Sequence, residues 1–258
     1  MKKYFRFVGL VMMAVMSYGI TACGSDDDDN SGGLSVSPNS VSMHFEDTKQ
    51  LKADGATSWS SEDEFVATVD SKGLVTGEHV GKTKVIASNG KSSGICEVEI
   101  TPEYTLYTDP VLNWGASMST IKSEVSKELV SSDEKTLTYK YTIGSDPCVM
   151  GYSFENNKLK NVIAIFAYSY YLRAGYYLIE RFQPVYSEDG QYLFIDAMKP
   201  EKAKTAVLFS TTKSGSTTLV SIIYTDYNTL GNSKAPNRSM KISEDIQEQQ
   251  DKLMRYFK

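Results

Sequence analysis

Short apolar runs separated by turn residues fill the segment from Leu34 to Thr101, and this pattern limits the fold more than any other feature of the chain. The run Val41–Phe45 alternates apolar and polar residues, which is typical of a strand buried on one face. Turn sequences such as Asp54-Gly55 and Asn89-Gly90 separate such runs. Short strands at this spacing predict an all-β sandwich.

Five motifs follow one another in the same segment. They are Trp59-Ser60-Ser61, Val66-Ala67-Thr68-Val69-Asp70, Gly73-Leu74-Val75-Thr76-Gly77, Gly81 and Ile86-Ala87. In this order they resemble the bacterial immunoglobulin-like (Ig-like) domain of group 2, over about a quarter of the chain. The resemblance implies an Ig-like spacer or adhesion module on a bacterial surface, with no shared active site. We expect Trp59 to anchor the core, the alternative being an exposed platform for a sugar ring.

The first 22 residues have the composition of an export signal. Lys2, Lys3 and Arg6 precede an uncharged run from Phe7 to Ala22. This run is shorter than the ~20 apolar residues that span a bilayer comfortably. A basic start, a short apolar stretch and small residues before a break predict a signal peptide over residues 1–22.

Cys23 stands directly after this predicted signal, in the sequence Gly19-Ile20-Thr21-Ala22-Cys23-Gly24. The segment resembles the lipobox of bacterial lipoproteins, although Ile20 stands where that family most often has Leu. The resemblance implies cleavage before Cys23 and its acylation with chains such as palmitate, which anchor the protein to a membrane. Removing residues 1–22 takes away three basic residues and moves the formal charge from -5 to -8. The alternatives are a secretory signal with a chance cysteine, or a signal anchor.

Residues 23–33 contain four consecutive aspartates, several Ser and Gly residues and no apolar residue after Cys23. Such a segment cannot pack a core, so we expect a solvated tether. Ser25-Asp26-Asp27-Asp28 resembles the surface-export signal of outer-membrane lipoproteins in Gram-negative gut anaerobes, which implies a lipid-anchored protein facing outward. The alternative is an ordinary spacer that faces the periplasm.

Residues 102–258 form the second predicted domain, and their sequence resembles no family that we recognise. Met118, Ile121, Val125 and Leu129 share one helical face, with Ser117 as the N-cap. Three predicted strands follow this helix: Thr136–Ile143, Cys148–Glu155 and Lys158–Tyr168. Asn156-Asn157 favours a hairpin turn between the last two.

A second helix is predicted over Leu172–Pro184, because Leu172, Tyr176, Ile179 and Phe182 share a face. Three more predicted strands follow: Gln191–Ala197, Thr205–Thr212 and Thr217–Tyr224. The order α-βββ-α-βββ predicts an α+β domain with helices packed on antiparallel sheet, in the layout of a tandem of two α-βββ units. Its layout is similar to that of β-lactamase-inhibitor-like domains, an analogy of fold alone.

A final helix is predicted after a polar stretch. Ser243-Glu244-Asp245 has the composition of an N-cap with acids in the first turn, and Ile246, Leu253 and Phe257 lie on one side. We expect this helix to dock on the second domain, the alternative being a partner protein.

The sequence lacks the residues of familiar catalytic and metal sites. Its two histidines, His44 and His79, both lie in the β segment, so residues 102–258 hold no Ser-His-Asp triad. Neither histidine has the companions of a metal site, and we expect no cofactor. Acidic balance argues against nucleic acid as a partner. Cys96 and Cys148 either pair in a disulfide or stay buried thiols.

Tyrosine is the remaining signal for binding, because fourteen of the seventeen tyrosines lie between Tyr104 and Tyr227. Five of them crowd one junction: Tyr168, Tyr170, Tyr171, Tyr176 and Tyr177. Tyrosine supplies apolar area and a hydroxyl group at low entropic cost, which suits recognition of sugars or proteins. The alternative is that these rings fill the core between helix and sheet.

These observations predict a non-catalytic protein that is anchored to the outer membrane by lipid. It would present a binding or adhesion domain on an Ig-like stalk, with a glycan or a protein as ligand. Two alternatives remain: a secreted hydrolase that acts on polysaccharide through paired carboxylates, and a structural subunit of a surface assembly.

Overall fold

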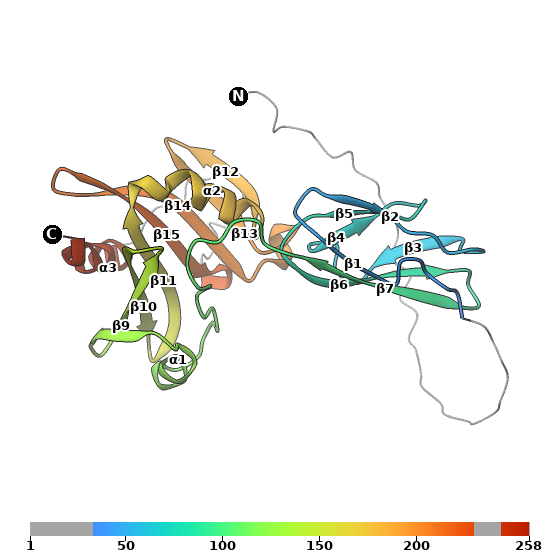
Figure 1. The fold of residues 1–258 in the computed structure, drawn as a ribbon. Coiled ribbons are helices and arrows are strands. Elements are labelled where there is room, and N and C mark those ends of the chain that lie inside the picture. The colour runs from blue at the N-terminus through green and yellow to red at the C-terminus, as the bar shows by residue number, and fades with distance from the viewer. Residues whose placement is uncertain (1–32, 230–243, 258) are drawn as a thin grey trace. The chain divides into compact units, whose positions relative to one another are not determined.

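The computed structural model describes residues 33–229 and 244–257 (Figure 1). The chain divides into two units, residues 1–32 and 33–258, and every described residue lies in the second unit. The predicted signal peptide, Cys23 and residues 24–32 of the tether lie outside the described residues, as does the predicted cap Ser243. Within the described segments, no helix is both long and apolar enough to cross a membrane.

Seven strands near the N-terminus form two sheets that face each other. One sheet has the order β1 (Ser40–Met43), β7 (Ser93–Ile100), β6 (Gly81–Ser88) and β3 (Ser58–Ser61). The other has the order β2 (Thr48–Gln50), β5 (Leu74–Gly77) and β4 (Ala67–Val69). Only β1 and β7 pair in parallel. The predicted sandwich is confirmed.

Alternate positions of these strands bury a common core. Its members include Leu51, Val75, Val85, Cys96 and Val98. Trp59 is half-buried and packs against this core, next to Gly73. A Cβ atom on Gly73 would come within 2.8 Å of the indole ring, and φ there is +81°, so both the space and the backbone require glycine.

The C-terminal domain contains one antiparallel sheet of eight strands (Figure 1). Helix α1 (Met118–Glu124) precedes the first four strands: β8 (Glu128–Ser132), β9 (Thr136–Ile143), β10 (Asp146–Glu155) and β11 (Lys158–Ala167). The 3₁₀ turn η1 (Tyr168–Tyr170) and helix α2 (Tyr171–Ile179) precede the other four. These are β12 (Gln183–Glu188), β13 (Gln191–Ile195), β14 (Thr205–Ser214) and β15 (Thr217–Asp226), with η2 (Pro200–Lys202) before β14.

Helices α1 and α2 are therefore each followed by four strands, where the sequence predicted three. The sheet order is β12-β13-β14-β15-β11-β10-β9-β8, so the last strand of each unit meets the other at the centre. The two missed strands form the sheet edges. Strand β8 is exposed throughout and shows no alternation, and β12 contains Pro184, which weakens the sequence signal for a strand. Leu129, predicted to extend the first helix, lies in β8.

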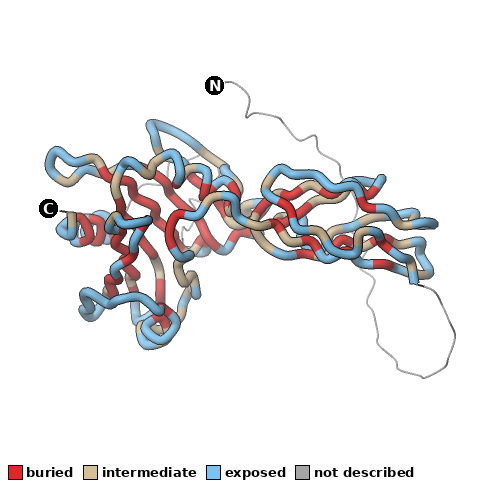
Figure 2. Tube along the Cα trace, in the orientation of Figure 1, coloured by how far each residue is buried: buried red, intermediate tan, exposed pale blue. Residues whose placement is uncertain are grey.

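Both faces of this sheet are covered. Ile121 of α1 and Ala174, Tyr177 and Leu178 of α2 join the core on one face, and Ser117 accepts a hydrogen bond from the Thr120 N–H as the predicted N-cap of α1. Helix α3 (Glu244–Met254), followed by η4 (Arg255–Phe257), covers the other face. The final helix thus docks on its own domain, the first of the two predicted alternatives. Figure 2 shows the buried segments running along the central strands.

The two described cysteines are free and lie in different cores. Cys96 is buried in the Ig-like sandwich, and Cys148 is buried in the C-terminal domain. The disulfide between them that the sequence left open is absent, and both behave as small buried apolar residues. Burial raises the pKa of each thiol, so neither is reactive at neutral pH.

Candidate binding face on helix α2

The five tyrosines predicted as a binding cluster divide into three environments. Tyr168 and Tyr176 are each 51% exposed, whereas Tyr177 is 1% exposed. Tyr170 and Tyr171 are half-buried. The structure therefore brings only part of the predicted cluster to the surface, because consecutive residues of a helix point in directions about 100° apart.

Tyr177 belongs to the core between α2 and the sheet. Its hydroxyl donates a hydrogen bond to Asp109, and the guanidinium of Arg181 lies 4.0 Å from the centre of its ring. Burial, with the nearby Tyr224 and the Asp109 carboxylate, raises the pKa of Tyr177 well above its usual value. This hydroxyl stays protonated and serves the fold, which corrects its assignment to a ligand site.

Tyr170 and Tyr171 fix the start of α2. The hydroxyl of Tyr170 lies 2.8 Å from a carboxylate oxygen of Asp146 and 2.9 Å from the carbonyl oxygen of Ile143. The hydrogen bond to the Asp146 carboxylate raises the pKa of Tyr170. Tyr171 stacks on Phe209, with ring centres 4.8 Å apart. Burial, together with bonding to Tyr192, raises the pKa of Tyr171 to about 12. Both rings position the helix.

The outer face of α2 carries a continuous apolar stripe, here called the α2 stripe. It consists of Tyr168, Leu172, Tyr176 and Ile179, whose exposed fractions are 51%, 73%, 51% and 37%. Spacings of four and three residues place Leu172, Tyr176 and Ile179 on one side of α2, and Tyr168 lies in η1 just before the helix. The sequence predicted an apolar face of Leu172, Tyr176, Ile179 and Phe182, of which Phe182 is buried beyond the end of α2. An apolar face of a helix normally turns inward. Here Ala174, Tyr177 and Leu178 take the inward positions instead.

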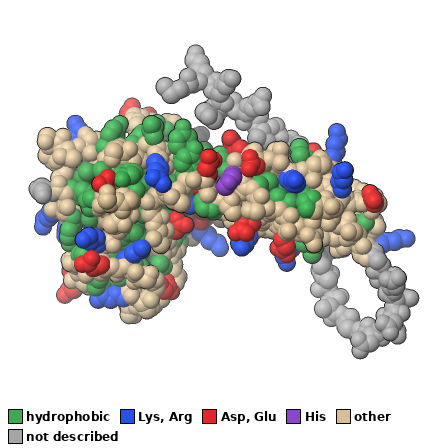
Figure 3. Space-filling view, viewed as in Figure 1, with side chains coloured by type: hydrophobic (Ala, Val, Ile, Leu, Met, Phe, Trp, Pro, Cys, Tyr) green, Lys and Arg blue, Asp and Glu red, His purple; other side chains and the backbone are tan. Residues whose placement is uncertain are grey.

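Neighbouring rings hold the α2 stripe in place. Tyr104 stacks on Tyr176 with ring centres 4.8 Å apart, and Tyr168 stacks on Tyr171 at 5.4 Å. Arg173, beside Leu172, donates a hydrogen bond to the Thr105 hydroxyl at 3.1 Å. Such ordered aromatic groups lose little conformational freedom on binding. Figure 3 shows hydrophobic side chains gathered over this side of the C-terminal domain.

A buried acidic residue at the end of α2 secures the segment that leads into the domain. Glu180 is 2% exposed, and its carboxylate accepts hydrogen bonds from the N–H groups of Glu103 and Tyr104 at 3.0 and 3.1 Å. Arg181 neutralises it by a direct ion pair. Tyr104, which no sequence pattern assigned to a site, is thereby held against Tyr176.

The side chains of the α2 stripe suit contact with another surface, because they offer apolar area. Within the described residues, no group of three or more His, Cys, Asp and Glu side chains could hold a metal ion. His44 is exposed, while His79 is buried and stacks on Phe65 at 4.0 Å between ring centres.

Comparison with known proteins supports the N-terminal assignment. The family model of the bacterial Ig-like domain (group 2) matches residues 33–99, within two residues of the predicted limits. No curated protein matches the chain.

Two solved structures are similar over part of the chain. A crystal structure of an EHEC O157:H7 intimin mutant is 20% identical, with 43% of this chain and 79% of that chain covered and a TM-score of 0.22. Domains 5-6 of the S-layer protein SbsC are 12% identical, with 75% and 82% covered and a TM-score of 0.23. The assignment of the N-terminal domain rests on the family match. Residues 33–99 are a bacterial Ig-like domain of group 2.

Proposed function

We propose that this protein is a non-catalytic binding protein of the cell surface, whose α2 stripe contacts a protein partner. Cys23 carries the lipid anchor in the outer membrane, residues 23–33 act as the tether, and the Ig-like domain acts as a spacer. The C-terminal domain presents the ligand-binding surface.

The observation that carries this proposal is the exposure of four large apolar side chains along α2 and the turn η1 that precedes it. Leu172 and Ile179 form no hydrogen bonds through their side chains, so they suit a protein surface better than a polyhydroxylated sugar. Burying a leucine or isoleucine side chain contributes about 1.5–3 kcal/mol, so the stripe can supply the energetic centre of an interface. An apolar patch of this kind on a soluble domain typically marks an interaction site.

Replacing Leu172 with Ser tests the proposal. Leu172 is the most exposed member of the α2 stripe, so Leu172→Ser should lower partner affinity tenfold or more while leaving the fold unchanged. Partners would be trapped on intact cells by a photo-crosslinking residue at position 176 and identified by mass spectrometry. Affinity for the trapped partner would then be measured for each variant.

Leu129→Ser is the matched control, because Leu129 is also an exposed leucine, 40% exposed, but lies in the edge strand β8. It should leave partner affinity unchanged. Equal effects of the two substitutions, or no effect of Leu172→Ser, would contradict a role for the α2 stripe. Release of reducing ends from polysaccharide by the purified protein would support a hydrolase instead, and concentration-dependent polymers would support a structural subunit.

A further inference from the structure

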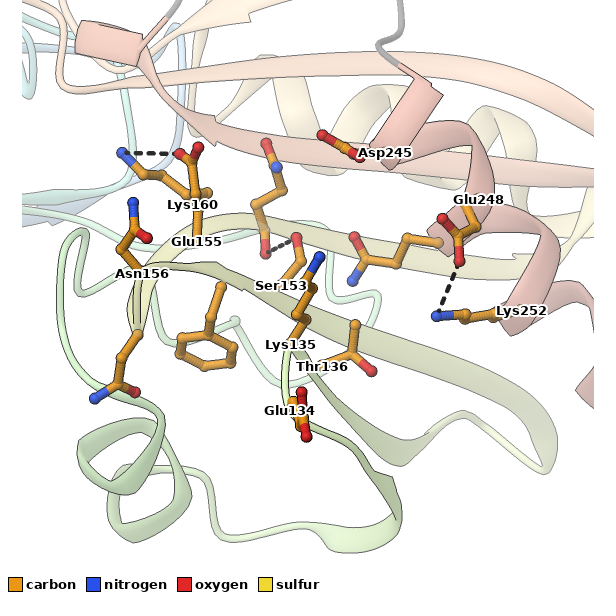
Figure 4. A pocket seen from close by; sticks show the side chains of 14 residues that line it. Glu134, Lys135, Thr136, Ser153, Glu155, Asn156, Lys160, Asp245, Glu248 and Lys252 are labelled. Carbon is orange, nitrogen blue, oxygen red and sulfur yellow. Dashed lines mark hydrogen bonds and ion pairs between the residues drawn. The ribbon is translucent and has the colours of Figure 1, made fainter.

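A pocket of about 590 Å³ lies beside helix α3, where the turn before β9 and the hairpin of β10 and β11 approach it (Figure 4). None of the residues that line it belongs to the α2 stripe. Its size falls in the range of small-molecule sites. Figure 4 shows Glu155 and Lys160 of the hairpin on one side and Glu248 and Lys252 of α3 on the other.

Gln249 of α3 lines this pocket and is only 4% exposed, yet neither its amide oxygen nor its amide nitrogen has a hydrogen-bond partner. Its neighbour Gln250 is also buried but donates a hydrogen bond to the Ser221 hydroxyl at 2.8 Å. Gly151 makes room for the unpaired amide, since a Cβ atom there would lie 3.0 Å from the Gln249 nitrogen. Buried polar groups without partners are rare and destabilising, so a ligand that pairs with this amide would explain its retention.

The charges around the pocket nearly cancel. Four carboxylates and three lysines line it, and two of the lysines are already paired: Lys160 lies 4.0 Å from Glu155, and Lys252 lies 3.2 Å from Glu248. Neither a strongly anionic nor a strongly cationic ligand would therefore be favoured. The other polar groups in the lining are neutral amides and hydroxyls, among them Thr136, Ser153 and Asn156.

We infer that this pocket binds a neutral saccharide through the Gln249 amide. A sugar hydroxyl both donates and accepts, so adjacent hydroxyls can pair with the amide oxygen and the amide nitrogen once rotation of the buried Gln249 side chain turns its amide into the pocket. This site is separate from the α2 stripe and does not depend on the function proposed for it.

The test uses the full chain in detergent and isothermal titration calorimetry with maltotetraose, cellotetraose, mannotetraose and chitotetraose. At least one should bind. Gln249→Leu, which keeps the size of the side chain, should lower that affinity at least tenfold without lowering the melting temperature. Gln247→Leu is the matched control: Gln247 lies on the exposed side of α3, outside the pocket, and its loss should change affinity less than twofold.

Thr136→Tyr gives a second, independent variant, because a bulky ring on the pocket wall should block the site even if Gln249→Leu folds poorly. Affinity should also stay constant between about 0.05 and 0.5 M salt, since the ligand is uncharged. The inference is overturned if no tetrasaccharide binds, if both pocket variants keep full affinity, or if Gln247→Leu weakens binding as much as Gln249→Leu. If Leu172→Ser alone abolished binding, the saccharide would bind at the α2 stripe, and the inference about the pocket would likewise be overturned.

Discussion

His79 is a buried titratable side chain in the connection between β5 and β6 of the Ig-like domain. Its ring stacks nearly parallel to that of Phe65, and its Nδ1 lies 2.7 Å from the Phe65 carbonyl. Burial lowers the pKa of His79, and the hydrogen bond to Phe65 opposes this shift only in part. The folded chain therefore takes up a proton at this site less readily than the unfolded chain does.

This shift predicts a pH dependence of stability. The unfolded histidine titrates near pH 6.5, so the free energy of unfolding should be constant above about pH 7 and fall as the pH drops towards 5. His79→Phe keeps the stacked ring but removes the titrating group, so its curve should be flatter. Urea unfolding of both proteins at several pH values measures the difference, and parallel curves would contradict the assignment to His79.

At the scale of single elements, the β10–β11 hairpin couples turn geometry to the start of α1. Asn156 and Asn157 have φ values of +51° and +57°, in the left-handed region that suits a two-residue hairpin turn. The Asn157 side-chain oxygen also accepts a hydrogen bond from the Met118 N–H, at the first residue of α1. One side chain thus serves the turn and the helix terminus together.

Two substitutions separate these roles. Asn157→Gly keeps the backbone freedom and loses only the hydrogen bond, so it should cost about 0.5–1.5 kcal/mol. Asn157→Ala should cost roughly 1–2 kcal/mol more, because alanine is strained at positive φ. Chemical denaturation of both variants gives the comparison, and equal losses would show that the turn conformation carries no strain.

The sequence predicted the Ig-like domain fully, the face of α2 in part, and the pocket beside α3 not at all. The motifs around Trp59 and Val66 identified the Ig-like domain, because a small sandwich places specific residues at its turns and core. The shared face of Leu172, Tyr176 and Ile179 was visible in the helical spacing, but its direction was not, since Ala174, Tyr177 and Leu178 form a second apolar face. The pocket beside α3 was not predictable, because Gln249 and the hairpin are far apart in the chain and meet only through packing.

At the scale of the whole molecule, the proposed order is lipid anchor, tether, Ig-like spacer and binding domain. This order predicts that Cys23→Ser abolishes labelling with an alkyne analogue of palmitate and moves the protein out of the membrane fraction, since several acyl chains anchor stably. Protease added to intact cells should digest the wild-type protein if it faces outward. Survival of the protein until the outer membrane is permeabilised would place it in the periplasm instead.

The central pairing of β11 with β15 also bears on how the domain is made. Asn161 pairs with Thr225, so the middle of the sheet closes only after more than sixty further residues are available. A chain exported amino end first would present β11 as an open edge, able to pair with strands of other chains, until β15 arrives. For the export proposed here, assembly of the domain therefore depends on β15, and the risk of aggregation is greatest before β15 has crossed the membrane.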